Sequence, residues 1–186
     1  MTKIKYAIVL TFVGAALAGA IGLPGGGGKI DTTKIDNCIA AINDVSAKFE
    51  SVKGKIETCR TNLDGIAKAH GISDVLSDLS KAATLKDALT DEEKASLQKD
   101  VQTLTSVPGD IQTISATIPD ILTNQLPAAL TDVVNQIQAN PLKAGDLKAK
   151  QDKLNEGKAA LENIATDAPA TVDAATALVN TINGII

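Results

Sequence analysis

The fold is decided by residues 35–66, which read IDNCIAAINDVSAKFESVKGKIETCRTNLDGI. Apolar side chains recur in this stretch at alternating steps of three and four residues, and the spacing continues over more than four heptads. Such a repeat is typical of a helix with one narrow apolar seam that packs against another helix. The apolar positions are Ile35, Cys38, Ile42, Val45, Phe49, Val52, Ile56, Cys59, Leu63 and Ile66.

The signals for the ends of this helix lie just outside the repeat. The polar residues 31–33 can cap its first turn, and Gly71, directly after His70, can end it. Gly54 interrupts the repeat at a cost of about 1 kcal/mol relative to alanine, which a helix of this length tolerates. We therefore expect one long helix between these two signals.

The rest of the chain also predicts helices. Ser73 can cap a short helix, and Thr90 with Glu93 forms a capping box at the start of the next one. Residues 97–121 continue the heptad spacing, and a last amphipathic helix begins near Asp146.

Two further signals mark the C-terminal region. Pro169 is expected to end the helix that begins near Asp146, and Thr171 is expected to cap a closing helix. No stretch shows the alternation expected of a β-strand. The sequence therefore predicts an all-α protein whose long amphipathic helices form a helical bundle or an extended antiparallel coiled coil, with residues 31–186 as a single helical domain.

The first 20 residues resemble an export signal. Lys3 and Lys5 precede an apolar run over residues 6–18, and small residues around Ala18 and Ala20 suit a cleavage site. The alternative is an uncleaved anchor, because residues 6–24 are uncharged and just long enough to span a bilayer. A glycine-rich linker follows over residues 21–30. We expect an exported protein, located in the periplasm, outside the cell or at the cell surface.

The chain has two cysteines, Cys38 and Cys59, which are 21 residues apart. On one continuous helix their separation would be about 31 Å, far beyond the 7 Å or so that a disulfide allows between α-carbons. A hairpin would permit a bond within the chain, and two parallel chains would permit bonds between chains. Both residues can also serve as small buried hydrophobes. Because exported cysteines are usually paired, we expect a disulfide within the chain.

Composition argues against several functions. The net charge is −4 and aromatic residues make up only 2% of the chain, so the basic face and stacking platforms of nucleic-acid binding are missing. His70 is the only histidine, and its position at a helix end suits a cap. One histidine and two distant cysteines make no metal or redox site. We expect no enzyme activity, no cofactor, no metal and no small-molecule substrate.

The remaining signals indicate an interaction protein, such as an adaptor, a chaperone-like holder or a structural component. Its interaction seam, through which it would bind a protein partner or itself, comprises Ile35, Ile42, Phe49, Ile56 and Leu63.

A second hypothesis concerns residues 101–142. This segment carries only three charged residues, all aspartate, and four of the six prolines in the chain. We expect a helix wrapped on most sides by its neighbours. The alternative is a surface that binds lipid or a membrane.

Overall fold

The structure is a computed structural model that describes residues 30–73, 75–76 and 79–186. Within these ranges it is all-α and contains no strand, which confirms the predicted fold class as a helical bundle. The α-helices are α1 (Thr33–Ala69), α2 (Leu79–Ala88), α3 (Asp91–Thr105), α4 (Val107–Asp120), α5 (Leu126–Ala139) and α6 (Ala144–Ile185). A π-helical turn, η1 (Ile121–Gln125), joins α4 to α5, and a 3₁₀ turn, η2 (Pro141–Lys143), precedes α6.

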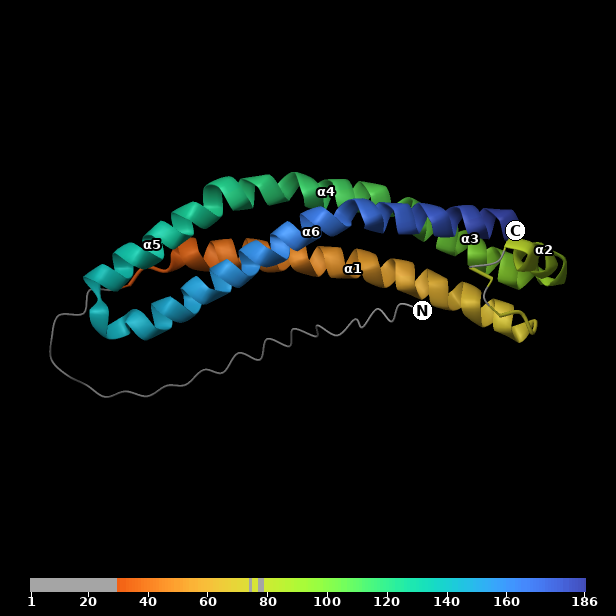
Figure 1. The fold of residues 1–186 in the computed structure, drawn as a ribbon, viewed down its shortest axis with the longest axis horizontal. Coiled ribbons are helices and arrows are strands. Elements are labelled where there is room, and N and C mark those ends of the chain that lie inside the picture. Colours follow the sequence, from red (N-terminus) through yellow and green to blue (C-terminus); the bar gives the residue numbers. More distant parts are fainter. Residues whose placement is uncertain (1–29, 74, 77–78) are drawn as a thin grey trace.

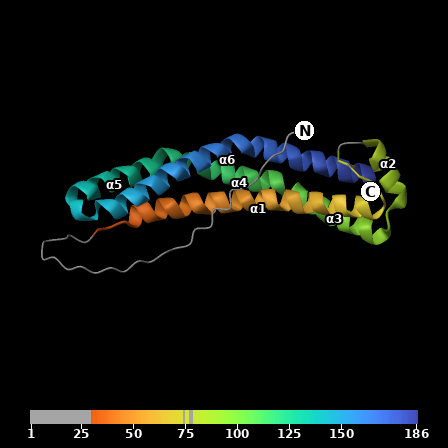
Figure 2. The ribbon, with the colours of Figure 1, turned by 60° about the horizontal axis from the view of Figure 1, so that its bottom comes forward.

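The helices form three long rods that lie side by side (Figures 1 and 2). The first rod is α1, the second is the succession α3–α4–η1–α5, and the third is α6. α1 and α6 run in the same direction, and the middle segment of the chain runs back antiparallel to both. α2 lies at the end where α1 finishes, and α6 packs against all five other α-helices.

α1 is the single long helix that the heptad repeat predicts, with 37 residues. All ten apolar positions of the repeat are buried, and Ala67 joins them. Gly54 lies on the exposed side and does not interrupt the helix. At the C-terminus, Gly71 adopts a φ of +71°, a left-handed conformation that favours glycine and ends the helix.

The prediction of a disulfide is wrong. Cys38 and Cys59 are both free and lie on the same unbroken helix, so no hairpin brings them together. Their side chains are only 1% and 2% exposed, because they occupy seam positions inside the core. This burial also keeps both sulfurs away from any second chain. The two cysteines therefore act as small buried hydrophobes.

The second rod shows how the chain accommodates its prolines. The predicted capping box is present: Oγ1 of Thr90 accepts a hydrogen bond from the backbone amide of Glu93, and the Glu93 carboxylate accepts one from the amide of Thr90. Pro127 has no amide hydrogen to give to an earlier carbonyl. The chain bypasses this gap in η1, where the amide of Leu126 donates to the carbonyl of Ile121, five residues earlier. The rod thereby bends without ending.

Two of the predicted helix boundaries are wrong. α6 continues through Pro169 for 42 residues, so Thr171 caps no separate helix. Pro169 itself is exposed, whereas Ala168 and Ala175 on either side of it remain in the core. Burial of that face therefore outweighs the local cost of the proline. α2 begins at Leu79, after a turn at residues 75–76, and no helix begins at Ser73 in the described part.

Two contacts define how α1 and α6 align. Gly157 of α6 faces Ile42 so closely that a Cβ on residue 157 would lie 2.8 Å from both Cδ1 and Cγ2 of Ile42. Seven residues earlier in α6, Lys150 forms an ion pair with Asp36. Contacting residues in the two parallel helices therefore differ in number by about 115.

The predicted signal peptide and residues 21–29 of the predicted linker lie outside the described residues. Among the helices that are described, none is both long enough and apolar enough to cross a membrane.

Candidate functional site

The five residues of the predicted interaction seam all lie inside the bundle. Each is at most 7% exposed, and α1 packs through this face against α6 and the second rod. The seam is therefore filled by the chain itself, and a partner that leaves the fold intact must use another surface. The five residues are Ile35, Ile42, Phe49, Ile56 and Leu63.

Residues 101–142 are not wrapped on most sides, contrary to our expectation. Only one face of this rod is buried, and the outward face carries threonine, glutamine, asparagine, alanine and proline. Val134 and Leu142 are the large hydrophobic side chains of the segment that are exposed. Uncharged polar side chains therefore solvate this helix in place of charges. The face lacks the broad apolar stripe and the basic residues that hold a helix on lipid.

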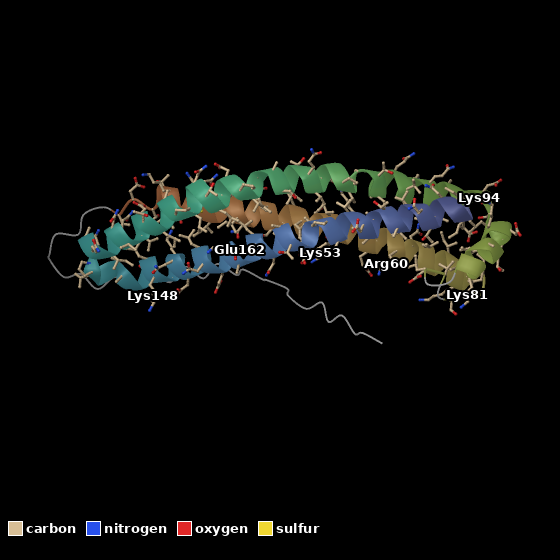
Figure 3. All side chains as sticks on the ribbon, turned by 45° about the horizontal axis from the view of Figure 1, so that its top comes forward. Lys53, Arg60, Lys81, Lys94, Lys148 and Glu162 are labelled. Carbon is tan, nitrogen blue, oxygen red and sulfur yellow. The ribbon has the colours of Figure 1, made fainter. Side chains whose placement is uncertain are left out.

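Charged residues concentrate elsewhere on the molecule. Neither residues 101–142 nor residues 159–186 contain a lysine or an arginine. The charged side chains labelled in Figure 3 accordingly lie on α1, α2, α3 and α6, with those of α6 in its first half. The cationic side chains of the described part are therefore confined to α1, α2, α3 and residues 143–158, and those on the C-terminal half of α1 include Arg60 and Lys68.

His70, the only histidine, joins the end of α1 to the start of α3. Its Nε2 lies 3.0 Å from Oε2 of Glu93. The hydrogen bond from the Thr90 amide, and then the one from His70, hold the pKa of Glu93 below its usual value. Oγ1 of Thr90 also donates to the same carboxylate, so this hydroxyl is not paired with the imidazole as a nucleophile would be. The arrangement is a structural junction between two helix ends.

The described residues contain no group of three or more potential metal ligands close together. The thiols of Cys38 and Cys59 are expected to be unreactive at neutral pH. Burial raises the pKa of Cys38, and burial together with the negative charge of Asp100 raises that of Cys59 to about 11. A thiol that stays protonated is a poor nucleophile and a poor metal ligand.

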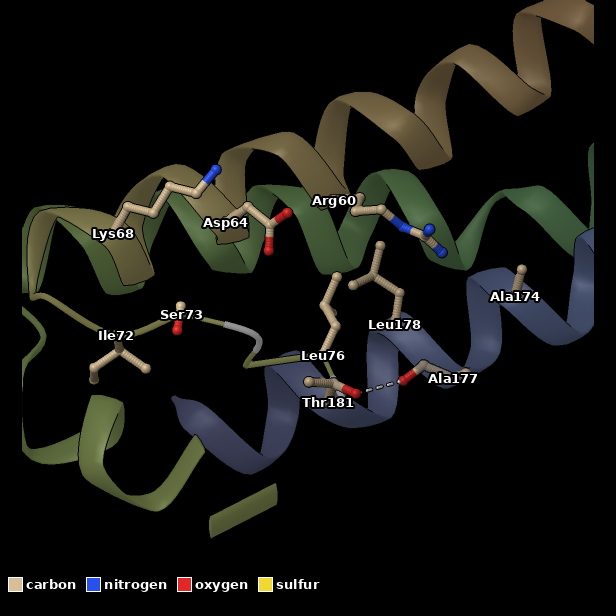
Figure 4. A pocket seen from close by; sticks show the side chains of 10 residues that line it. All are labelled: Arg60, Asp64, Lys68, Ile72, Ser73, Leu76, Ala174, Ala177, Leu178 and Thr181. Carbon is tan, nitrogen blue, oxygen red and sulfur yellow. Dashed lines mark hydrogen bonds between the residues drawn. The ribbon is translucent and has the colours of Figure 1, made fainter. Parts of the chain in front are cut away.

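A groove of about 530 Å³ lies between the C-terminal half of α1, the C-terminal part of α6, and Ile72, Ser73 and Leu76, which follow α1 (Figure 4). Leu178 and Leu76 contribute its apolar surface, and Leu76 is 36% exposed, one of the few large hydrophobic side chains that face solvent. α6 presents small side chains along the groove. They are Ala174, Ala177 and Thr181.

One wall of the groove is a row of charges on α1. Arg60, Asp64 and Lys68 are spaced by four residues, so they lie above one another on one face of the helix. Within the described part of the chain, none of the three forms an ion pair or a hydrogen bond through its side chain. Elsewhere on α1, by contrast, Lys55 pairs with Asp110 of α4 at 2.7 Å. The charges of the groove are therefore free to meet a partner.

A second depression, of about 380 Å³, lies near the opposite end of the bundle, between the start of α1 and α5. It offers no large aliphatic side chain and a single basic one, Lys34. The groove beside Arg60 is larger and combines apolar, cationic and anionic groups, so it is the stronger candidate for a binding site.

The fold and the groove together define an all-α bundle with a mixed apolar and charged groove on its surface. No protein-family model matches the chain, and no curated protein or solved structure is significantly similar to it. The function is therefore argued from the geometry of the described residues.

Proposed function

We propose that the chain is a non-enzymatic helical-bundle interaction protein that binds a protein partner through the groove between α1 and α6. The observation that carries the proposal is the row of unpaired charges, Arg60, Asp64 and Lys68, beside the exposed Leu76. An apolar centre with charges at its edge is the usual composition of a protein–protein contact. The export signal that the sequence predicts over residues 1–20 is compatible with an exported adaptor, a chaperone-like holder or a structural component.

The form of the groove favours a protein over a small molecule. Two parallel helices line it, α1 and α6, and it is open to solvent on one side. A small ligand is usually enclosed on most sides, whereas a helix can lie along an open groove and bury a stripe of side chains. Among its described lining residues no nucleophile is paired with a base, which is compatible with a role in binding.

The proposal is tested by photo-crosslinking in the cell that produces the protein. A photoreactive residue is placed at Ala177 in the groove and, as a matched control, at Gln112, which is exposed on α4. We expect a discrete covalent adduct with protein from position 177 and none from position 112. Loss of the position 177 adduct in an Arg60→Glu chain would add support. Equal labelling from both positions, or no adduct from position 177, would contradict the proposal.

A further inference from the structure

The row of charges beside the groove includes one further residue of α1 that does not line the groove itself. Glu57 precedes Arg60, Asp64 and Lys68 on the exposed side of α1, and its side chain also has no partner within the described part. At about 100° of turn per residue, all four positions fall within an arc of about 80° of the helix surface. Read along the helix, this charge row alternates in sign: negative, positive, negative, positive.

A row with this alternation is complementary to itself when reversed. If a second copy of α1 lies antiparallel to the first, Glu57 faces Lys68 of the second copy and Arg60 faces Asp64 of the second copy. The same two pairs repeat in the other direction, as twofold symmetry requires. The twofold axis then passes near residue 62. A parallel arrangement would place like charges opposite one another, and an axis at residue 64 would place Arg60 against Lys68.

α6 is consistent with the same axis. Because contacting residues of α1 and α6 differ by about 115, the position on α6 level with residue 62 is about residue 177. The small residues that line the groove are centred there: Ala177 lies at the middle, with Ala174 and Thr181 on its two sides. The axis therefore places Ala174 against Thr181 of the second copy, and small side chains allow two helix backbones to approach closely.

We propose that the occupant of the groove is a second copy of this chain, bound antiparallel about a twofold axis near residues 62 and 177. This proposal rests on the proposed function, because it names the partner of the same groove. α1 of each copy would pack antiparallel on α1 of the other, and α6 on α6, with the charge rows setting the register. The exposed Leu76 of each copy would be covered at the edge of this contact. Charge pairs at such an edge chiefly fix orientation and register.

The test measures the mass of the purified full chain in solution by sedimentation over a range of concentrations. The unchanged chain is expected to dimerise. Arg60→Glu and Asp64→Arg each place like charges in contact at two symmetric points, so each is expected to weaken dimerisation by at least about tenfold. Lys99→Glu, the matched control on α3, makes the same change of charge at an exposed position outside the groove and is expected to dimerise normally.

Two further samples test the pairing itself. An equimolar mixture of the Arg60→Glu and Asp64→Arg chains brings opposite charges together at both points, so it is expected to form a heterodimer. The chain that carries both substitutions is expected to regain self-association. Formation of the heterodimer also shows that both single variants are folded.

A chain that stays monomeric at every concentration would overturn the proposed dimer, as would a mixture of the two variants that stays monomeric. An adduct from position 177 with a different protein would also overturn it, but the proposed function would stand. Absence of any adduct at position 177, by contrast, would contradict the proposed function itself.

Discussion

The contact between Gly157 and Ile42 makes the sharpest test of the packing between α1 and α6. A methyl group added at residue 157 would lie 2.8 Å from Cδ1 and from Cγ2 of Ile42. Carbon atoms in favourable contact are about 3.5–4.0 Å apart, so Ile42 or the helix backbone must shift. Ile42 is buried, so a rotation about its χ1 that moves Cγ2 away would push other atoms of the side chain into the packed core. Gly157→Ala therefore overpacks the core.

The magnitude follows from two opposing effects. Replacing a glycine within a helix by alanine stabilises the helix by about 1 kcal/mol. Overpacking a well-packed core costs about 1–3 kcal/mol. Gly54 provides the matched control, because it lies inside α1 and a Cβ there would have no other atom within 4 Å. We therefore expect the Gly157→Ala chain to have a free energy of unfolding about 1–3 kcal/mol below that of the Gly54→Ala chain.

The assay is urea unfolding followed by far-ultraviolet circular dichroism. A double-mutant cycle with Ile42→Ala identifies the cause, because this substitution removes both atoms that the new methyl group would meet. Ile42→Ala should destabilise the Gly157→Ala chain less than the unchanged chain, by about 0.5–3 kcal/mol. Equal stability of the Gly157→Ala and Gly54→Ala chains, or a cycle without coupling, would refute the close approach of α1 to α6.

Three other predictions concern individual side chains. Cys38 and Cys59 should resist alkylation at neutral pH in the folded chain and react quickly in urea. A native chain whose mass is two units too low and returns to the full value with reductant would contain a disulfide and contradict this. Because the pKa of Glu93 is lowered from 4.5 and that of Asp110 from 3.8, the unfolded chain binds more protons in acid. The free energy of unfolding should therefore fall as the pH drops below about 4.5, and less steeply in Glu93→Gln. Identical pH profiles for the two chains would argue against the hydrogen bonds that Glu93 accepts from Thr90 and His70. Thr90→Ala removes the side-chain acceptor of the capping box, so it should lower the free energy of unfolding by about 1 kcal/mol in the same urea assay. An unchanged free energy of unfolding would show that the cap contributes nothing.

Much of the candidate site could be recognised in the sequence only after the groove was known. The spacing of Arg60, Asp64 and Lys68 places them on one helix face by helical geometry alone. The same spacing is expected of any solvated helix face, so by itself it does not identify these three residues as a binding site. Their importance comes from the small residues of α6 opposite them, more than 100 positions further along the chain. No local pattern encodes that proximity.

The disulfide prediction failed for a related reason. The heptad pattern correctly indicated a continuous helix, whereas the disulfide was predicted because exported cysteines are usually paired. The structure follows the helix: Cys38 and Cys59 remain apart, because burial of the whole seam stabilises α1 along its length. The prediction for residues 101–142 was wrong for a similar reason. The scarcity of charged residues there was interpreted as burial, but uncharged polar side chains cover the exposed face.

The sequence by itself determined the local features of this protein. Its heptads predicted α1 and the helical stretch over residues 97–121, Thr90 and Glu93 predicted the capping box, and Gly71 predicted the end of α1, since these signals act over a few residues. Three features were decided only by the tertiary structure: the continuation of α6 through Pro169, the close approach of Ile42 to Gly157, and the position of the groove. Each of those depends on packing between segments that are distant in the chain, where burial outweighs local preference.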